Sequence, residues 1–392
     1  MRSAGVMWSL LLAATGLCPA AAADWDGTIP PYQLFPGDEV LDIGGVAGGA
    51  LCSNDGNGNQ AVSGAAKLSP RLHRDFDSGL SLGLNATLTA SDVLSRGRYS
   101  GDAVEQAYGD ARTGLGHLEI GQVDGAAYQL AVTGPKVDDQ VSLDNPQTTF
   151  FRDPSTGHAF TDIFALRTEI GASSNFAKFA YVSPNLFGAQ LALSFTPSEG
   201  KDVLPWLHEG PHLPGRQAGI WEGALKYADD FGPVSLSAYG GAAVGHAEHK
   251  PAGQEGITDL GVGARADYSI NDDLTLSLGG AWRQSNAYAF QVARSFQGAT
   301  TRALQASASA TYESWVVGVE YGNGDAGKIP SAPRLDLAGY QASLGYNFSN
   351  SIAISAGWQR LNYDRSSGVF YNALPRIGLD AVFLHLNLKT SS

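Results

Sequence analysis

The sequence has 392 residues and a formal net charge of −13, from 25 basic and 38 acidic side chains. This acidic balance argues against nucleic acid as a partner, because phosphate backbones bind to basic surfaces. Glycine is abundant at 49 residues, and charged residues make up only 16% of the chain. Such a composition permits either a large core or one large closed sheet, so the pattern along the chain must decide between them.

Residues 1–23 have the three parts of a secretory signal peptide. Arg2 is followed by an apolar run from Val6 to Cys18 and then by small residues at Ala21 to Ala23. We expect this segment to be removed on export, which leaves Cys52 as the one cysteine and allows no internal disulfide.

Residues 24–38 contain three prolines and are predicted to form an extended periplasmic lead-in to the first strand. No later stretch approaches the 18 or more apolar residues of a membrane-spanning helix.

The main signal after residue 38 is an alternation of apolar and polar residues. Between Leu80 and Thr89 the even positions are apolar and most odd positions are polar, and the same period of two recurs at 274–283, 352–359 and 382–389. This period indicates strands with one apolar and one polar face. Aromatic residues at strand ends are typical of the girdles at membrane surfaces; they are Tyr181, Tyr227, Tyr268, Tyr312, Trp315, Tyr346 and Trp358.

The connections between these strands alternate in length. Seven short turns and eight longer connections divide the chain into about sixteen strands, from near Val40 to near Lys389. The better segments alternate over roughly 9 to 11 residues, the length that crosses a bilayer at a tilt. A soluble sandwich or propeller would use shorter strands. Residues 39–392 are therefore predicted to form an all-β, transmembrane, antiparallel up-and-down barrel.

The longest interruption of this pattern runs from about Gln122 to Gly171. Loops of this length are uncommon unless they are functional or disordered. Aromatic and aliphatic residues such as Tyr128, Phe164 and Leu166 argue against disorder, because they can anchor the loop against another surface.

Two hairpins of the chain resemble those of the general porins of Gram-negative bacteria. They read AVEQAYGDARTGLGHLEIGQ at 103–122 and SNFAKFAYVSPNLFGAQLALSF at 174–195. The resemblance implies a homotrimer in the bacterial outer membrane, among its lipid and lipopolysaccharide, with a water-filled channel for small hydrophilic solutes and ions. It also implies that the third long loop, 122–171, folds into the barrel and narrows it. The chain departs from the family by ending in LHLNLKTSS rather than on an aromatic residue.

Candidate pore residues follow from this interpretation, because a charge at the narrowest point of a low-dielectric channel acts strongly on passing solutes. On the constriction loop, the candidate acids are Asp124, Asp138, Asp139, Asp144 and Asp153. On the inward face of the wall, the candidate bases are Lys67, Arg71, His73, Lys178, Lys226, Arg265 and Arg283. Opposed acidic and basic rows would create a transverse field, and the negative net charge favours mild cation selectivity.

Two other functions share the predicted fold. A receptor or adhesin would use the long loops to bind a partner. A barrel hydrolase would need a histidine beside a nucleophile, but the eight histidines are scattered and no GxSxG motif accompanies them. We therefore expect no enzymatic activity. No cofactor is expected either, and Ca²⁺ at an acidic loop pair such as Asp138 with Asp139 is the one open alternative.

Overall fold

The computed structural model describes residues 31–33, 39–54, 60–91, 104–144, 161–199, 216–248, 252–290, 295–326, 334–365 and 376–390. The expected signal peptide, most of the lead-in at 24–38 and the candidate Asp153 lie outside these residues.

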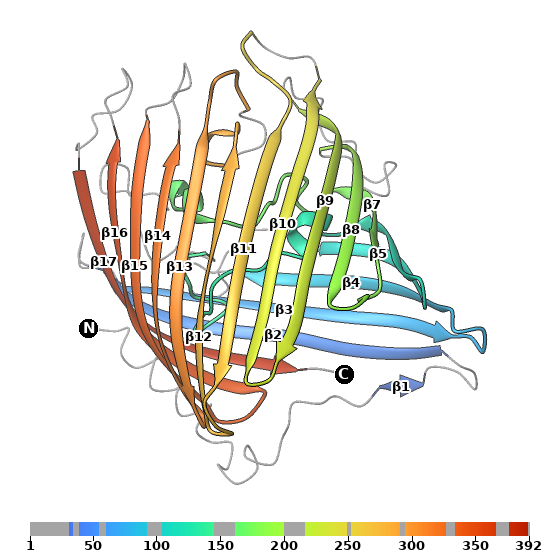
Figure 1. Ribbon diagram of the computed structural model, residues 1–392, viewed down its shortest axis with the longest axis horizontal. Helices are drawn as coiled ribbons and strands as arrows, with labels where there is room; N and C mark the ends of the chain where they lie inside the picture. The colour runs from blue at the N-terminus through green and yellow to red at the C-terminus, as the bar shows by residue number, and fades with distance from the viewer. Residues whose placement is uncertain are drawn as a thin grey trace.

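The described part of the chain is almost entirely β-strand (Figure 1). A two-residue strand β1 (Tyr32–Gln33) pairs with β2. The other strands are β2 (Glu39–Asn54), β3 (Gln60–Asp75), β4 (Ser81–Ser91), β5 (Val104–Thr113), β6 (Gly116–Gln122), β7 (Ala177–Val182), β8 (Ala189–Ser198), β9 (Gln217–Phe231), β10 (Val234–Ala247), β11 (Thr258–Ser269), β12 (Leu274–Ser285), β13 (Thr301–Tyr312), β14 (Trp315–Ala326), β15 (Leu335–Asn347), β16 (Ile352–Arg365) and β17 (Arg376–Thr390).

Strands β2 to β17 close into a barrel of 16 strands. Each pairs antiparallel with the next along the chain, and β17 returns to pair with β2, for example Thr390 with Gly45. In Figure 1, β9 to β17 form the near wall, and β2 to β5 cross behind them. The fold class and the strand number predicted from the alternating pattern are confirmed.

The apolar face of each strand points outward. Leu84 on β4 is 64% exposed and Leu278 on β12 is 66% exposed, whereas inward-facing Ser277 is buried. A water-soluble protein would not leave so many leucines and valines exposed. In an outer-membrane barrel they face lipid, and backbone pairing around the closed ring satisfies the peptide groups.

Exposed aromatic residues gather beside the short turns. Tyr227, Tyr268 and Tyr312 lie within a few residues of a turn, and Trp315 packs against Tyr346 with ring centroids 4.7 Å apart. The predicted girdle is therefore present at this edge. Trp358 is an exception, because it lies in the middle of β16 rather than at its end.

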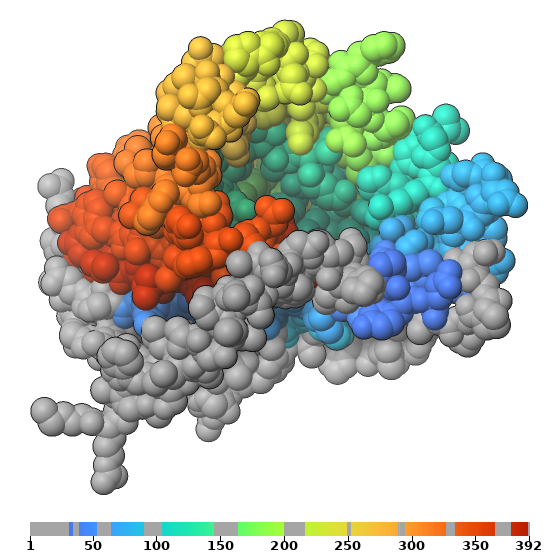
Figure 2. Space-filling view, turned by 90° about the horizontal axis from the view of Figure 1, so that it is seen from below, coloured from blue at the N-terminus to red at the C-terminus, as the bar shows by residue number. Residues whose placement is uncertain are grey.

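The segment between β6 and β7 contains a short helix, α4 (Ala126–Gln129), and a 3₁₀ turn, η1 (Thr161–Leu166). Its apolar residues join two buried clusters with inward-facing wall residues, one with β7 to β10 and one with β2 and β14 to β17. We call this segment, residues 123–176, the inner loop. Seen from below in Figure 2, the barrel is hollowed at its centre, with teal and green atoms inside the hollow.

Candidate pore site

Glu222 on β9 binds both ends of the inner loop. Its buried carboxylate accepts the backbone N–H of Ala127 at 3.2 Å, near the start of the loop, and that of Ser173 at 2.9 Å, near the end. Gly125 allows this approach, because a Cβ at that position would overlap the Glu222 carboxylate. One wall side chain therefore holds the two ends of the loop close together.

Lys178 on β7 binds the same two ends from the other side. Its ammonium donates to the carbonyl oxygens of Val123 and of Ser174, the latter at 2.7 Å, and the residue is 2% exposed. A buried ammonium needs such acceptors to offset its lost hydration. Lys178 was a predicted pore-wall base, but its head group is directed into the loop base.

The middle of the loop is bound to successive wall strands. Gln305 on β13 accepts from the N–H of Gly134 at 3.1 Å, and Glu320 on β14 accepts from the N–H of Leu143 at 3.0 Å. Gln341 on β15 donates to the carbonyl oxygen of Val141 at 3.0 Å. These contacts satisfy loop backbone groups that would otherwise be buried without partners.

The loop also lies directly against wall glycines. A Cβ at Gly263 on β11 would overlap the carbonyl oxygen of Val132, and one at Gly279 on β12 would lie 3.1 Å from the Cα of Gly134. The absence of a side chain at these two wall positions allows the loop backbone to follow the inner surface closely.

Asp138 fixes the far part of the loop to the last strands. Its Oδ2 lies 2.5 Å from Nδ1 of His385 on β17 and accepts from the Ser355 hydroxyl on β16 at 2.5 Å. Burial alone would raise the pKa of Asp138, but the His385 and Ser355 contacts outweigh it and hold this pKa below its usual range. Asp138 is thus a loop acid that contacts the adjacent wall.

A second buried acid, Asp144, is neutralised within the loop. Lys136 lies 3.2 Å from its Oδ2, and Thr168 donates through both its N–H and its hydroxyl to Oδ1. Although burial opposes it, the Lys136 charge lowers the pKa of Asp144. Burial and the Asp144 carboxylate raise the pKa of nearby Glu169, which lies 3.6 Å from Lys136.

The described residues of the inner loop, 123–144 and 161–176, cover part of the inner wall, while side chains on β3 and β5 stay exposed. Beneath the loop, polar wall residues are fully buried, with Thr196, Asp259 and Gln305 at 0% exposure. On β3 and β5, by contrast, the inward side chains of Lys67 and Arg112 are 48% and 47% exposed. We call the inward face of β3 to β5 the open wall.

The charges of the open wall are paired with one another. Lys67 lies 2.7 Å from Glu105, which also accepts from the Thr89 hydroxyl at 2.6 Å. Arg71 and Arg112 lie 3.3 and 2.8 Å from the same carboxylate oxygen, Oδ2 of Asp110.

His73, also a predicted wall base, lies 3.2 Å from Asp42 on the neighbouring strand β2. The three open-wall bases predicted from sequence therefore each contact a wall acid. Glu105, Asp110 and Arg112 were not among the predicted site residues. The parity of Asp110 and Arg112 on β5 could have indicated them, whereas that of Glu105 could not.

The other predicted residues lie elsewhere. Arg283 is buried and forms an ion pair with Asp259 at 2.6 Å, and Arg265 pairs with Asp267 at 2.9 Å. Lys226 is half-buried on the inward face of β9. Asp124 accepts from Gln106 at 2.8 Å, and Asp139 is exposed. Within the described ranges, no ion pair joins a predicted loop acid to a predicted wall base.

The described residues contain no group of three histidine, cysteine, aspartate or glutamate side chains placed to hold a metal ion. In the same part of the chain, no helix is long and apolar enough to cross a membrane.

Comparisons with known proteins match one family model and several solved structures. A family model for Gram-negative porins matches residues 9–366. No curated protein sequence matches significantly.

Solved structures share the fold at low sequence identity. An anion-selective porin from Comamonas acidovorans is 16% identical, with a TM-score of 0.56 over 90% of this chain and 99% of that one. OmpF of Salmonella typhi, in complex with daunomycin, is 13% identical, with a TM-score of 0.58 over 91% and 100% of the two chains. The trimer form of OmpT from Vibrio cholerae is 12% identical, with a TM-score of 0.54 over 90% and 99%.

Proposed function

The chain belongs to the Gram-negative porin family and forms a channel across the bacterial outer membrane, and we propose that its inner loop narrows this channel against the open wall. The single observation that supports the narrowing is the burial contrast. Wall residues beneath the loop are fully buried, while Lys67 and Arg112 on the opposite side are about half exposed. Solutes then pass between the loop and β3 to β5.

In this proposal the predicted site residues have two different roles. Asp138, Asp144 and Lys178 hold the inner loop in place through the contacts described above. Lys67 and Arg71 line the path, because both lie on the inward face of β3 with part of the side chain exposed. A loop held against the wall by buried contacts keeps a constant channel width, which suits passive diffusion rather than catalysis. We propose no enzymatic role.

Single-channel recording of the reconstituted protein tests this function. We expect stepwise conductance from the full chain and a larger step from a variant that lacks residues 138–154, in which the Glu222 and Lys178 contacts at the loop base remain. Absence of steps from the full chain would contradict the channel. Unchanged step size in a correctly folded deletion variant would contradict the narrowing while leaving the channel intact.

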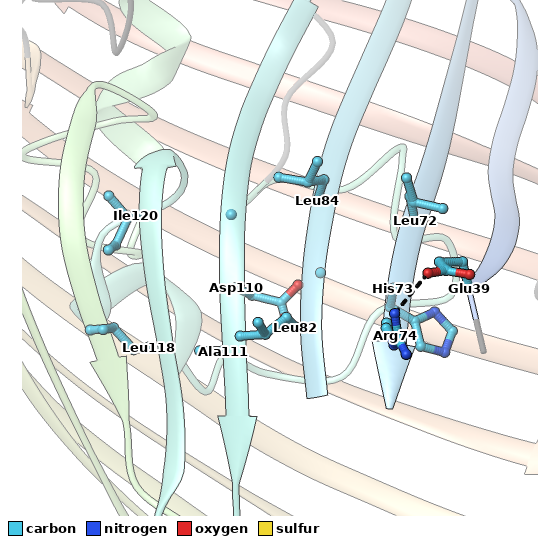
Figure 3. A pocket seen from close by; sticks show the side chains of 12 residues that line it. Glu39, Leu72, His73, Arg74, Leu82, Leu84, Asp110, Ala111, Leu118 and Ile120 are labelled. Atoms are coloured by element: carbon cyan, nitrogen blue, oxygen red, sulfur yellow. Dashed lines mark hydrogen bonds and ion pairs between the residues drawn. The ribbon is translucent and has the colours of Figure 1, made fainter. Parts of the chain in front are cut away.

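We also propose that the protein forms a homotrimer through the outer face of β3 to β6, within the lipid and lipopolysaccharide of the outer membrane. An apolar groove of about 430 Å³ crosses this face (Figure 3). Leu72 on β3, Leu84 on β4 and Ile120 on β6 line it (Figure 3). On β5 it is lined by two small residues, Gly109 and Ala111. A neighbouring copy of the chain would fill such a groove with its own apolar side chains, as the trimer form of the similar OmpT suggests.

The trimer can be tested by filling the groove. Gly109→Phe keeps the face apolar but removes the hollow, and Ala264→Phe adds the same side chain to the outer face of β11, on another part of the barrel. We expect cross-linking in detergent to capture trimers of the wild type and of Ala264→Phe but not of Gly109→Phe. Equal trimer yields from all three proteins would rule out this contact face.

A further inference from the structure

The open wall contains acids as well as bases, and one acid is there because of an irregularity in the sheet. Thr87 on β4 is paired with Gln106 on β5, but the next residue, Leu88, is paired with Val104. Glu105 is therefore the extra residue of a β-bulge, a feature that redirects side chains. In a regular register it would face lipid beside Leu88.

The bulge directs Glu105 inward, onto Lys67 and Thr89. Its backbone carbonyl oxygen accepts a hydrogen bond from the side chain of Asn175, at the end of the inner loop. Glu105 therefore contacts both the inner loop, through Asn175, and Lys67, through the ion pair. The side chain of Lys67 is 48% exposed and that of Glu105 is 34% exposed, so both charges remain accessible to a solute.

The next charges along the open wall are also paired, but their carboxylate is buried. Arg71 and Arg112 flank Asp110, whose side chain is 0% exposed and also accepts a hydrogen bond from Asn85. The bases of the open wall are thus balanced by nearby carboxylates, so this wall has little net charge. At Lys67 and Glu105 it offers an accessible positive and an accessible negative group side by side.

We propose that the open wall favours small zwitterions, such as α-amino acids, over uncharged solutes of the same size. The proposal rests on the proposed function, because the solute must pass along this wall. The ammonium and carboxylate of an α-amino acid are attached to one carbon, so their separation is comparable to the 2.7 Å between Lys67 and Glu105. An antiparallel approach brings each solute charge beside its opposite on the wall. A single cation or anion meets attraction from one member of the pair and repulsion from the other.

Liposome swelling with two isomers tests the proposal. Alanine and lactamide have the same atoms and nearly the same size, but only alanine is a zwitterion at neutral pH. We expect alanine to enter wild-type proteoliposomes roughly two- to fivefold faster than lactamide, the range that an accessible ion contact contributes. In the double variant Lys67→Gln/Glu105→Gln this ratio should fall toward one, while lactamide entry should persist and show that the channel is folded and open.

A matched pair on the outer face provides the control. Arg360 and Asp380 lie 3.2 Å apart on the outer face of β16 and β17, away from the groove on β3 to β6, so Arg360→Gln/Asp380→Asn should leave the ratio unchanged. No entry of either isomer into wild-type vesicles would contradict the channel itself. Equal entry of both isomers would overturn the zwitterion preference alone. A ratio that survives in the Lys67→Gln/Glu105→Gln variant would also overturn it.

Discussion

The substitution Glu222→Gln tests how the inner loop is held at its base. The Glu222 carboxylate accepts two loop N–H groups, from Ala127 and Ser173. A glutamine of the same shape has one carbonyl oxygen and one NH₂ group. Its oxygen can accept one of the two N–H groups, but its NH₂ group then faces the other N–H, and two donors cannot form a hydrogen bond. A hydrogen bond to a charged group contributes about 1.5–3 kcal/mol. Its loss should raise the fraction of detached loop bases about 10- to 140-fold.

Hydrogen exchange measured by mass spectrometry on the detergent-solubilised protein reports this detachment. Peptides that contain Ala127 and Ser173 should exchange faster in Glu222→Gln, while peptides of the barrel strands should exchange at the wild-type rate. Asp229→Asn is a suitable control, because Asp229 lies on the same strand but is exposed and contacts only the Tyr227 hydroxyl and the N–H of Asp230 among the described residues. Wild-type exchange of both loop peptides in Glu222→Gln would refute the reasoning.

Three further outcomes are expected. Leu278→Arg should destabilise the barrel by about 2–4 kcal/mol in vesicles if it lies near the bilayer centre, whereas Leu278→Phe should not; equal folding yields would contradict a lipid-facing position. Arg283→Met leaves the fully buried Asp259 without its partner and should lower stability by about 3–5 kcal/mol, measured as the temperature of the gel-mobility shift on unfolding. Arg265→Met, at a more exposed pair, should cost about 1 kcal/mol or less, and equal losses would count against the burial argument. Because the pKa of Asp138 is depressed in the folded protein, its contact stabilises the loop at neutral pH and is lost as the pH falls below the ordinary value of 3.8. Channel noise should therefore rise in acid for the wild type and be high at every pH for Asp138→Asn; identical pH profiles would contradict this.

The barrel could be predicted from sequence because a strand between lipid and water needs apolar residues on its lipid face and polar residues on its channel face. Leu84 and Asn85 illustrate this, since their alternation alone indicates which side faces the membrane. Strand lengths were less predictable. β9 has 15 residues and β10 has 14, more than the roughly 9 to 11 expected. Their ends continue beyond the apolar band, where alternation no longer marks the strand.

The candidate site was predicted in part. Inward parity placed Lys67 and Arg71 on the inner wall, but parity fails at Glu105, because a bulge shifts the register by one residue. Nor could the alternation of apolar and polar residues show which wall residue each loop acid contacts. Asp138 contacts His385, 247 positions later in the chain. Such a pairing depends on the path of the loop through the barrel, which no local pattern encodes.

The contact between Asp138 and His385 has a consequence for biogenesis. His385 belongs to β17, the last strand of the chain, so Asp138 gains this partner only after that strand has joined the sheet, and until then it is held by Ser355 on β16. The inner loop therefore acquires its contacts in the order of the wall strands, and the pair with His385 forms only as β17 pairs with β16 and β2. We expect the loop to reach its final position late in folding, when the ring of strands closes.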